Sequence, residues 1–467
     1  MTTEKKQRTA NTRLAQWGLT SFIGSLCFYC KFVLVDNLVF QNPPLRQAWE
    51  RYVQPKTKIL QIMNRLIYLG LFVSLFNLLT SCNGQTKNNK QLTPNNPTEK
   101  SKLVGGGCDG CELMYVGMPT NISSIDTSAG WTEKGQKLFV TGTVFKLDGK
   151  TPAPNVIIYY WQTDNNGYYS PQKGMDEKAK RHGHIRGWIK TNEEGKYSIY
   201  TIRPAPYPNE NIPAHIHTSI KEPNINNEYY IDEFVFDDDK LLSGEKRKAL
   251  ENRGGSGILR VLISGDLQIA EHNIILGLNI PNYPETNKTE QLSGLEIGED
   301  NPSFIPYHAY GPDKGTRTCP VCKYGRYHGI VYFVGNNPNW DDIKKWLTFL
   351  EQESITRSKY LKAYFVYGNE KDYSKDTRQK ELEKIGNELN LKNIALTFVP
   401  SMTDTESEVN LNKINPNVEN TLIIYRHRTI IDKFINLKPT EDNYKIISTT
   451  LDKTKSEYFD LQEPKHD

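Results

Sequence analysis

Short apolar runs that alternate with polar residues dominate the chain between about residues 105 and 283, and turns rich in Gly, Asn and Pro separate these runs. Alternation with a period of two is typical of strands, because successive side chains point to opposite faces of a sheet. The predicted strands are Leu138–Phe145, Val156–Tyr160, Ile185–Lys190, Tyr197–Ile202, Ile216–Ile220, Ile258–Ser264 and His272–Asn279. Short strands at this spacing predict an all-β domain, a sandwich or a barrel.

The pattern changes in residues 303–467, where strands alternate with segments whose apolar residues recur at helical spacing. This alternation predicts an α/β domain with the element order βαβαβ-ββα. The predicted strands are Gly329–Val334, Leu361–Tyr367, Ile394–Val399, Thr421–Tyr425 and Thr429–Asn436, and the predicted helices are Trp340–Glu353, Ser374–Leu389 and Asp442–Leu451. Residues 284–302 are rich in Pro, Asn, Glu and Ser and predict a linker between the two domains.

An uncharged apolar run at residues 66–79 follows Arg65 near the front of the chain. It has the length of a signal-peptide core and is short for a membrane span. It ends in Leu-Thr-Ser-Cys82, which resembles a bacterial lipobox, and this resemblance implies that Cys82 becomes a lipidated N-terminus. We therefore expect a signal peptide at residues 63–82, a polar tether at residues 83–104 and an exported lipoprotein anchored to a membrane.

A signal peptide begins a protein, yet 62 residues precede this one. We expect that translation starts at Met63 and that residues 1–62 are an over-extended reading frame. The alternative is an additional membrane-associated segment around Gly18–Phe40. The alternative to a lipobox is a buried helix that ends in Cys82 by chance.

Composition excludes several classes of protein. The 58 Lys and Arg against 54 Asp and Glu leave a formal net charge of +4, which argues against a nucleic-acid binder that works by neutralising phosphates. A hydrophobic content of 37% argues against a polytopic membrane protein, and 11% aromatic residues argue against wholesale disorder. The chain is therefore expected to be a multidomain protein with folded domains after its front segment.

Two Cys-x-x-Cys pairs, Cys108/Cys111 and Cys319/Cys322, lie in the β domain and in the α/β domain. Disulfides persist in exported proteins, so each pair can close on itself or on the other pair. Four thiolates can also bind zinc, but the wide separation of the pairs does not specify a metal site. We expect disulfides or a structural pairing rather than a metal.

Residues 203–217 carry the strongest candidate chemistry. His215 and His217 are two apart on a predicted strand, so both imidazoles face one pocket. Prolines stiffen the preceding chain and hold Tyr207 beside it, and a Gly turn farther upstream presents another tyrosine, Tyr168 or Tyr169. A His-x-His pair alone is a weak signal, but together with the two tyrosines it indicates a metal site.

These segments resemble the intradiol ring-cleavage dioxygenases, the family of catechol and protocatechuate dioxygenases. The resemblance rests on the segments Val140–Val144, Pro154–Tyr169, Arg186–Ser198 and Thr201–Ile220. It implies a β-sandwich that holds a non-haem Fe(III) ion through Tyr169, Tyr207, His215 and His217. It also implies that O2 opens a catechol-type ring between its two hydroxyls and gives a muconate-type diacid, a step in the catabolism of aromatic compounds.

Two tyrosines suit a ferric ion for a physical reason. Hard anionic oxygen ligands favour Fe(III), and the ion in turn makes ionised tyrosine tenable. Two phenolates and one hydroxide balance the charge of the ion while both imidazoles stay neutral. A catechol must lose two protons to chelate, and we expect Tyr207 to leave the iron and accept one of them.

Two positions depart from the family pattern. Ile212 stands where the family often has Arg before the Pro-Ala-His-Ile-His run, and Glu233 stands near the place of a family Gln. Both family residues help to stabilise charge that develops on the substrate. Arg186 is our candidate to fill this catalytic role.

Three neighbouring side chains are rival or supporting candidates. Tyr168 is the alternative to Tyr169 as a ligand because the two are adjacent. His182 and His184 are expected to be solvent-facing loop residues, with a position beside the metal ligands as the alternative.

The α/β domain resembles a thioredoxin-like fold. A reactive Cys-x-x-Cys in such a fold follows the first strand and opens a helix, where the thiol pKa is lowered. Cys319 and Cys322 instead precede the strand Gly329–Val334, and the segment Asn336–Trp340 occupies the expected site. We therefore expect a structural cysteine pair on a non-catalytic domain, with dithiol exchange and partner binding as alternatives.

These observations favour an exported Fe(III)-dependent dioxygenase that acts on a catechol-type aromatic and O2. One alternative is a non-catalytic binding or assembly module that keeps the β-sandwich without turnover. The other is a surface thiol–disulfide oxidoreductase that uses Cys319 and Cys322.

Overall fold

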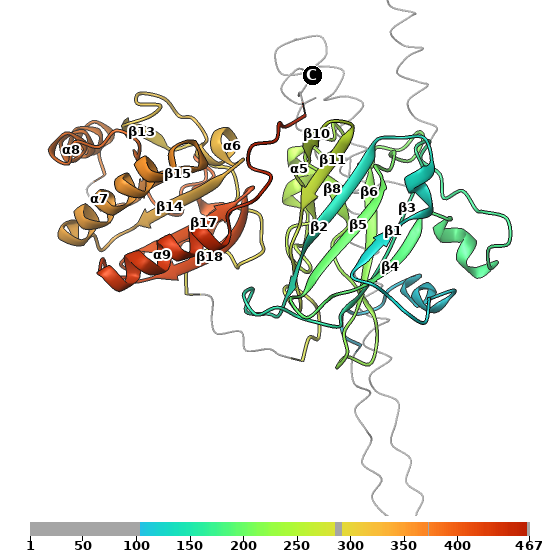
Figure 1. Ribbon diagram of the computed structural model, residues 1–467. Helices are drawn as coiled ribbons and strands as arrows, with labels where there is room; N and C mark the ends of the chain where they lie inside the picture. Colours follow the sequence, from blue (N-terminus) through green and yellow to red (C-terminus); the bar gives the residue numbers. More distant parts are fainter. Residues whose placement is uncertain (1–102, 285–291, 372, 465–467) are drawn as a thin grey trace, which may run out of the picture. The chain divides into compact units, whose positions relative to one another are not determined.

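The computed structural model describes residues 103–284, 292–371 and 373–464 (Figure 1). The expected signal peptide at residues 63–82, the lipidation site Cys82 and the leader at residues 1–62 lie outside the described residues. So does almost all of the expected tether at residues 83–104. Among the residues that the structure describes, no helix combines the length and the apolar character needed to cross a bilayer.

Residues 125–275 form two facing sheets, the β-sandwich (Figure 1). The first sheet has the order β1 (Ile125–Thr127), β5 (Lys196–Ile202), β2 (Lys137–Phe145), β11 (Leu267–Glu271) and β10 (Leu262–Ser264), with β12 (Ile274–Ile275) paired to β2. The second sheet has the order β4 (Arg186–Lys190), β3 (Ile157–Gln162), β6 (His215–Lys221), β8 (Phe234–Phe236) and β9 (Ile258–Leu259), with β7 (Tyr229–Tyr230) paired to β6.

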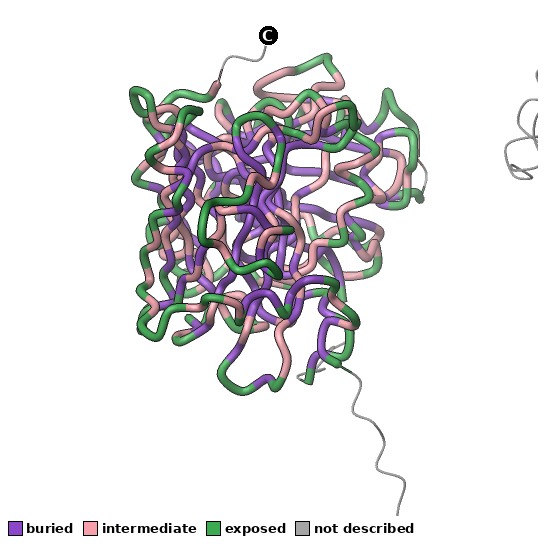
Figure 2. The backbone as a smooth tube through the Cα atoms, turned by 90° about the vertical axis from the view of Figure 1, so that its right-hand side faces the viewer, coloured by how far each residue is buried: buried purple, intermediate pink, exposed green. Residues whose placement is uncertain are grey.

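Alternate residues of these strands form the core between the sheets. Val140 of β2 faces Ile158 of β3 and Ile216 of β6 within one cluster of buried side chains, and each of the three is fully buried. The intervening residues of β3 and β6 therefore point to the other face of the second sheet. Exposed residues gather in the loops rather than along the strands (Figure 2).

One predicted strand region of the sandwich is wrong. The run Ile258–Ser264 is divided into β9 and β10, and His272–Asn279 contains only the two-residue strand β12. Gly265 has φ +60° and turns the chain back, so that β10 pairs antiparallel with β11. This turn directly follows the predicted run Ile258–Ser264, and the strand after it, β11, was not predicted.

Residues 307–453 form the third sheet, with the order β13-β16-β15-β14-β17-β18. Its strands are β13 (Tyr307–Tyr310), β14 (His328–Val334), β15 (Leu361–Tyr367), β16 (Ala395–Phe398), β17 (Thr421–Arg426) and β18 (Thr429–Ile435). Its helices are α6 (Pro320–Tyr324), α7 (Trp340–Arg357), α8 (Lys375–Glu388) and α9 (Glu441–Lys453). From β14 to α9, these elements confirm the predicted order βαβαβ-ββα, whereas β13 and α6 were not predicted.

The three long helices pack on one face of this sheet. Val334 of β14 lies in a cluster with Leu347 of α7, Leu382 of α8 and Leu451 of α9. The chain crosses from β14 through α7 to the parallel strand β15, and from β15 through α8 to the parallel strand β16. Both crossovers move in the same direction along the sheet, so both helices lie on the same face. The similarity to thioredoxin-like folds stays a prediction.

Loops cover the other face. Val331 and Phe333 of β14 pack there against Leu295 and Met402. Leu295 belongs to the segment 284–302 that we expected to be a linker, and Ser293 Oγ lies 2.6 Å from Thr421 Oγ1. Residues 292–302 are therefore part of the α/β domain's packing.

Shorter turns complete the described chain. They are the 3-10 turns η3 (Cys111–Tyr115), η4 (Ala129–Thr132), η5 (Lys178–His182), η6 (Ser358–Tyr360) and η7 (Val409–Asn412), and the short helix α5 (Gly244–Lys248). Of these, η3 and η5 lie next to the candidate site described below.

Candidate metal centre

Strand β6 places two histidines on the outer face of the second sheet. His215 and His217 flank Ile216, which is fully buried in the sandwich core. The register pairs His217 with Trp161 of β3, and the two rings stack with centroids 4.8 Å apart. The period of the strand, anchored by the buried Ile216, therefore brings both imidazoles to one side, as the sequence predicts.

A tight turn after β3 presents Tyr169. Asp164 organises this turn, because its carboxylate accepts hydrogen bonds from the backbone N–H of Asn166 at 2.8 Å and from the hydroxyl of Ser170 at 2.6 Å. Gly167 has φ +86°, and a Cβ on it would lie 2.2 Å from the carbonyl oxygen of Pro206. Only glycine fits this close approach of the two segments.

The proline-rich segment that carries Tyr207 is tied to the same turn. The backbone N–H of Ala205 donates to the carbonyl of Asp164 at 3.1 Å, and Thr163 Oγ1 donates to the carbonyl of Ala205 at 2.7 Å. Tyr169 and Tyr207 therefore reach the histidines from two loops that are held to each other.

The four side chains meet at one point. The hydroxyls of Tyr169 and Tyr207 lie 2.5 Å apart, and Nε2 of His215 and Nε2 of His217 lie 3.1 Å apart. Tyr207 Oη is 3.1 Å from His215 Nε2 and 3.5 Å from His217 Nε2, and Tyr169 Oη is 2.8 Å from His217 Nε2. Neighbouring ligands with bonds of about 2.1 Å to one ion lie about 3 Å apart, so the donor set fits a metal.

In each histidine, the hydrogen-bond partner of Nδ1 fixes the ring so that Nε2 faces this point. Nδ1 of His215 donates to the carbonyl oxygen of Pro213 at 2.8 Å, since a carbonyl only accepts. Nδ1 of His217 is 2.5 Å from Tyr230 Oη and 3.0 Å from Glu233 Oε1, and Tyr230 itself donates to Glu233. In the neutral form of each ring, Nε2 therefore offers a lone pair to the centre.

Burial of the two tyrosines makes the centre depend on a cation. It raises the pKa of Tyr169 and of Tyr207, so both phenols keep their protons at neutral pH in the absence of a metal. The two phenolic protons can then be shared with the two Nε2 atoms. A trivalent ion stabilises the phenolates in their place, and binding would release protons.

Glu233 forms a second possible donor set with the histidines, because its carboxylate lies within 4.8 Å of ligand atoms of both. Glu233 contacts Nδ1 of His217, whereas Tyr169 and Tyr207 contact Nε2 of that ring. A metal shared by Glu233 and His217 would thus lie on the opposite side of the ring from the tyrosines. The geometry favours the set of two tyrosines and two histidines.

An open pocket of about 530 Å³ leads to the centre. Its lining includes the candidate ligands Tyr169, Tyr207 and His217, together with Trp161, Tyr230 and Glu233. A ring of aromatic faces beside a candidate ion suits a small planar aromatic molecule.

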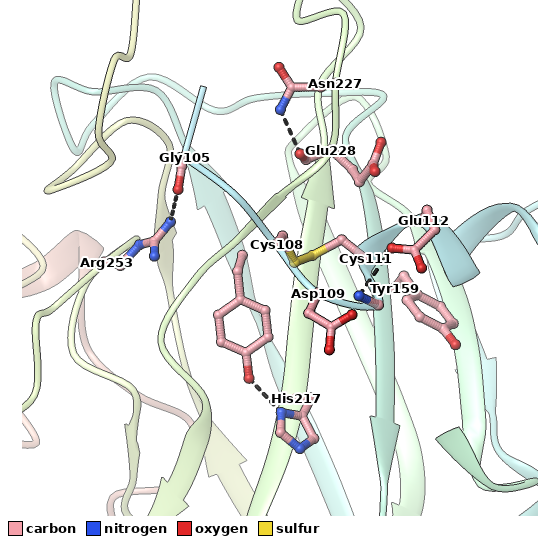
Figure 3. The surroundings of a disulfide bond; sticks show 12 residues. Gly105, Cys108, Asp109, Cys111, Glu112, Tyr159, His217, Asn227, Glu228 and Arg253 are labelled. Carbon is pink, nitrogen blue, oxygen red and sulfur yellow. Dashed lines mark hydrogen bonds between the residues drawn. A yellow bond between two sulfur atoms is a disulfide. The ribbon is translucent and has the colours of Figure 1, made fainter. Parts of the chain in front are cut away.

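The segment of residues 103–118 forms a wall of this pocket. Gly107, Cys108 and Asp109 line the pocket, and Cys108 is joined to Cys111 by a disulfide. In the view of Figure 3, Asp109 lies between this disulfide and the ring of His217. Arg253 donates to the carbonyl of Gly105 at 2.9 Å, which holds the start of the wall.

Arg186 does not line the pocket. Its guanidinium donates to Tyr159 Oη at 3.1 Å and to the backbone carbonyl of Val116, so it holds the wall segment against β3. The arginines that do line the pocket are Arg181 and Arg253. Sequence reasoning missed them because they come from η5 and from a loop that carry no recognisable motif.

Tyr168 and His182, the other candidates near the centre, differ in their exposure to solvent. Tyr168 is 57% exposed, so it points away from the buried centre that Tyr169 faces. The expectation that His182 faces solvent is wrong: it is 4% exposed and stacks on Trp161 with centroids 4.0 Å apart. Burial, with the nearby charge of Arg181, lowers the pKa of His182 to about 3, so it is neutral.

His184 is also held inside the structure rather than in solvent. Nδ1 lies 2.5 Å from the carbonyl oxygen of Ser170, and Nε2 lies 2.5 Å from Glu133 Oε1. These contacts fix the residue that follows Tyr169. His184 therefore supports the turn that presents a candidate ligand.

The second cysteine pair lies in the α/β domain, where Cys319 and Cys322 form a disulfide at the start of α6. Neither of the two described pairs crosses to the other. The position expected for a reactive pair, at the start of α7, holds Asn339 as the helix cap, with its side chain accepting from the N–H of Asp342.

Comparison with known proteins adds an independent line of support. Residues 116–253 match a family model described as dioxygenase. A catechol 1,2-dioxygenase of Acinetobacter baylyi is 32% identical over 121 residues, covering 22% of this chain and 38% of that protein. A hydroxyquinol 1,2-dioxygenase of Nocardioides simplex is 34% identical over 96 residues, covering 21% of this chain and 30% of that protein.

Among solved structures, the 3-chlorocatechol 1,2-dioxygenase of Rhodococcus opacus 1CP matches with 19% identity and a TM-score of 0.27, covering 34% of this chain and 68% of that one. This chain thus spans less than two fifths of the length of the two curated relatives. The family match and the curated relatives support the intradiol dioxygenase family for the β-sandwich.

Proposed function

We propose that the β-sandwich is an Fe(III)-dependent intradiol dioxygenase that acts on a catechol-type aromatic compound. The observation that carries the proposal is the convergence of Tyr169, Tyr207, His215 and His217: five of the six pairs of their donor atoms lie 2.5–3.5 Å apart. Three separate segments supply these side chains, and two oxygen and two nitrogen donors match a ferric ion.

The proposed reaction opens the ring between its two hydroxyl-bearing carbons. Both atoms of O2 enter the product, a muconate-type diacid, so no external reductant is consumed. When bound, Fe(III) would supply the Lewis acidity that activates the catechol for attack by O2. Tyr230, which lines the pocket beside His217, offers an apolar face against which the ring can lie.

The chain's own residues manage the protons of the substrate. A catechol gives up two protons when it chelates, and Tyr207 Oη is placed to accept one of them from the pocket side. Burial raises the pKa of Tyr207, which makes its phenolate a competent base once it is freed from a cation. The Nδ1 contacts of His215 with the Pro213 carbonyl and of His217 with Glu233 keep Nε2 of each ring directed to the centre.

Three further proposals concern the front of the chain and the α/β domain. We propose that Cys82 is lipidated and anchors an exported protein, which labelling with a fatty-acid probe would test against a Cys82→Ser variant. We also propose a thioredoxin-like domain in residues 303–467, supported by its βαβαβ-ββα order. The disulfide Cys319–Cys322 is proposed to be structural there.

The proposed function is tested by iron content, colour and oxygen uptake. The purified protein is expected to bind one iron per chain and to be reddish, because phenolates bound to Fe(III) absorb visible light. Catechol should then drive O2 consumption with a ring-opened diacid as product. Tyr169→Phe and His215→Ala should each abolish iron loading while the metal-free fold melts at nearly the same temperature.

The outcomes separate the candidate functions. Iron and colour without oxygen uptake on a panel of substituted catechols would favour the non-catalytic binding module. A colourless protein that binds no iron after refolding with Fe(III) would overturn the proposal outright.

A further inference from the structure

The two histidines of the candidate centre have different partners behind them. His215 is backed by a neutral backbone carbonyl, that of Pro213. His217 is backed by a carboxylate, that of Glu233, with Tyr230 Oη in the same group of contacts. Nothing in the strand pattern of β6 requires this difference, since the two histidines occupy equivalent positions on one face.

An irregularity in the sheet brings Glu233 to this place. Strand β8 pairs Phe234 with Ile216, whereas β7 pairs Tyr230 with Ser219. Four residue steps along the β7–β8 side therefore oppose three steps along β6, so one extra residue is accommodated between the two pairings. Bulges of this kind re-aim side chains and are frequent beside active sites.

The backbone at Glu233 is also closely packed from the other side. A Cβ on Gly257 would lie 2.3 Å from the carbonyl oxygen of Glu233, so only glycine permits the approach of the neighbouring segment. The carboxylate is held by two hydrogen-bond partners, His217 Nδ1 and Tyr230 Oη. Its position is thus determined by the fold rather than by a flexible loop.

We propose that Glu233 is a positioning residue for the metal centre: its carboxylate, together with Tyr230, holds His217 with Nδ1–H directed away from the metal and makes His217 the stronger donor of the two histidines. A carboxylate that accepts from the outer N–H of a ligating histidine fixes its tautomer and raises its basicity. The backbone carbonyl behind His215 also fixes the tautomer, but it carries no net charge and raises the basicity of the ring less. His215 is therefore the weaker donor.

This assignment differs from the role that sequence comparison suggests for the position. The family Gln near this place helps to stabilise charge on the substrate, whereas the Glu233 carboxylate contacts His217 and Tyr230. The proposal deepens the proposed function and rests on it for the identity of the metal. The tautomer of His217, however, is a property of the metal-free chain and can be measured without any metal.

The first test is therefore made on the metal-free protein. Nitrogen-15 NMR of the histidine rings is expected to show His217 as the Nδ1–H tautomer in the original chain and in Glu233→Gln, whose amide oxygen still accepts. Glu233→Ala should give a mixture of tautomers for His217 and leave His215 unchanged. An unaltered His217 signal in Glu233→Ala would overturn the proposal.

The second test measures the metal. Glu233→Gln should weaken Fe(III) binding about tenfold and Glu233→Ala about a hundredfold, the range seen for partners of ligating histidines. In iron-loaded Glu233→Gln the phenolate-to-iron absorption should move to longer wavelength, because a weaker histidine donor leaves the ion more electron-poor. Unchanged affinity and unchanged colour in Glu233→Gln would contradict the stated role.

A matched control separates this effect from general loss of a buried carboxylate. Glu222 is 8% exposed and accepts from the hydroxyls of Tyr229 and Tyr283. Glu222→Gln should change the melting temperature and leave both the His217 tautomer and the absorption maximum unaltered. Complete loss of iron in Glu233→Gln, as severe as in His215→Ala, would instead make Glu233 a direct ligand and overturn the proposal.

If the original chain binds no Fe(III), the proposed function fails, and the tautomer measurement still decides the role of Glu233. The two conclusions are thus tested independently.

Discussion

Tyr207, like Tyr169, reaches the centre from a loop rather than from a strand. The histidines lie on β6, whereas Tyr207 comes from a proline-rich loop whose neighbours Pro206, Asn209 and Glu210 are exposed. A loop-borne ligand can leave the centre without breaking the sheet. This difference fits the role of a proton acceptor that is released when the substrate arrives.

The Tyr207→Phe variant is expected to keep part of its iron and lose turnover. Tyr169, His215 and His217 still offer three donors, so we expect weaker but measurable iron binding. Loss of the proton acceptor should lower kcat by about 10²- to 10⁴-fold, the usual contribution of general-base catalysis. The measurement is oxygen uptake per bound iron with saturating catechol.

Tyr168→Phe is the matched control for this prediction. Tyr168 neighbours Tyr169 and is 57% exposed, so removal of its hydroxyl should leave iron content, colour and oxygen uptake unaltered. A Tyr207→Phe protein that turns over at the original rate per iron would show that another group accepts the proton.

Individual site residues were predictable to different degrees. The period of a strand was enough to place His215 and His217 on one face. Tyr169 and Tyr207 required the resemblance to a family, because no local rule indicates where two loops meet. The partner of His217, Glu233, is set by a bulge in the pairing of β6, and no pattern in the sequence marks that bulge.

At the scale of an element, the segment that contains Cys108 and Cys111 forms one wall of the pocket. Its disulfide closes a turn that includes Gly110, which has φ +92°, and Cys111 is completely buried. Cys108 and Asp109 line the pocket, whereas the candidate ligands come from other segments. Opening the disulfide should therefore disturb substrate binding more than metal binding.

A Cys108→Ser, Cys111→Ser double variant is expected to raise KM for catechol by up to about tenfold, with kcat and the absorption spectrum nearly unchanged. A change in KM alone indicates the loss of contacts that are equal in the ground state and the transition state. Steady-state oxygen uptake across a range of catechol concentrations gives both constants. The prediction rests on the proposed function.

The disulfide of the other domain provides the control. Cys319→Ser with Cys322→Ser should leave KM unaltered, because this pair lies on α6 of the α/β domain. If the Cys108 and Cys111 variant lost its iron, the wall would be part of the support of the metal centre rather than of substrate binding.

The elements themselves follow the sequence closely where burial is uniform. The predicted strand Leu361–Tyr367 agrees with β15 at both ends, and Gly368 directly follows the apolar run. The sequence failed at residues 258–279, where the predicted run Ile258–Ser264 is divided at Arg260 and Val261 and where β11 was missed. A hydrophobic run reports burial but not the place where a strand is interrupted.

On the scale of the described chain, each domain contains a histidine that is buried in its neutral form. Burial lowers the pKa of His272 in the β-sandwich to about 4 and that of His328 in the α/β domain to about 3. His184 differs: burial opposes its charge, but the Ser170 carbonyl and the Glu133 carboxylate raise its pKa above the ordinary value.

These shifts predict that both domains lose stability in mild acid. Between pH 6.5 and about 4 the unfolded chain binds a proton at His272 and at His328 that the folded chain does not. Unfolding is then favoured by about 1 kcal/mol per pH unit for each histidine. For His184 the sign is opposite: its stabilisation is present at low pH and is lost as the pH rises through its raised folded pKa.

Urea denaturation at pH 5, 6 and 7 checks both signs in one experiment, with the dependence on pH rather than the absolute stability as the measured quantity. His328→Gln should flatten the loss of stability toward pH 5, because it removes one proton taken up on unfolding. His184→Gln should steepen that loss, because it removes a group that stabilises the folded chain in acid. Equal slopes in both variants would show that other groups, such as Asp232 with its pKa raised to about 6 by burial, dominate the acid response.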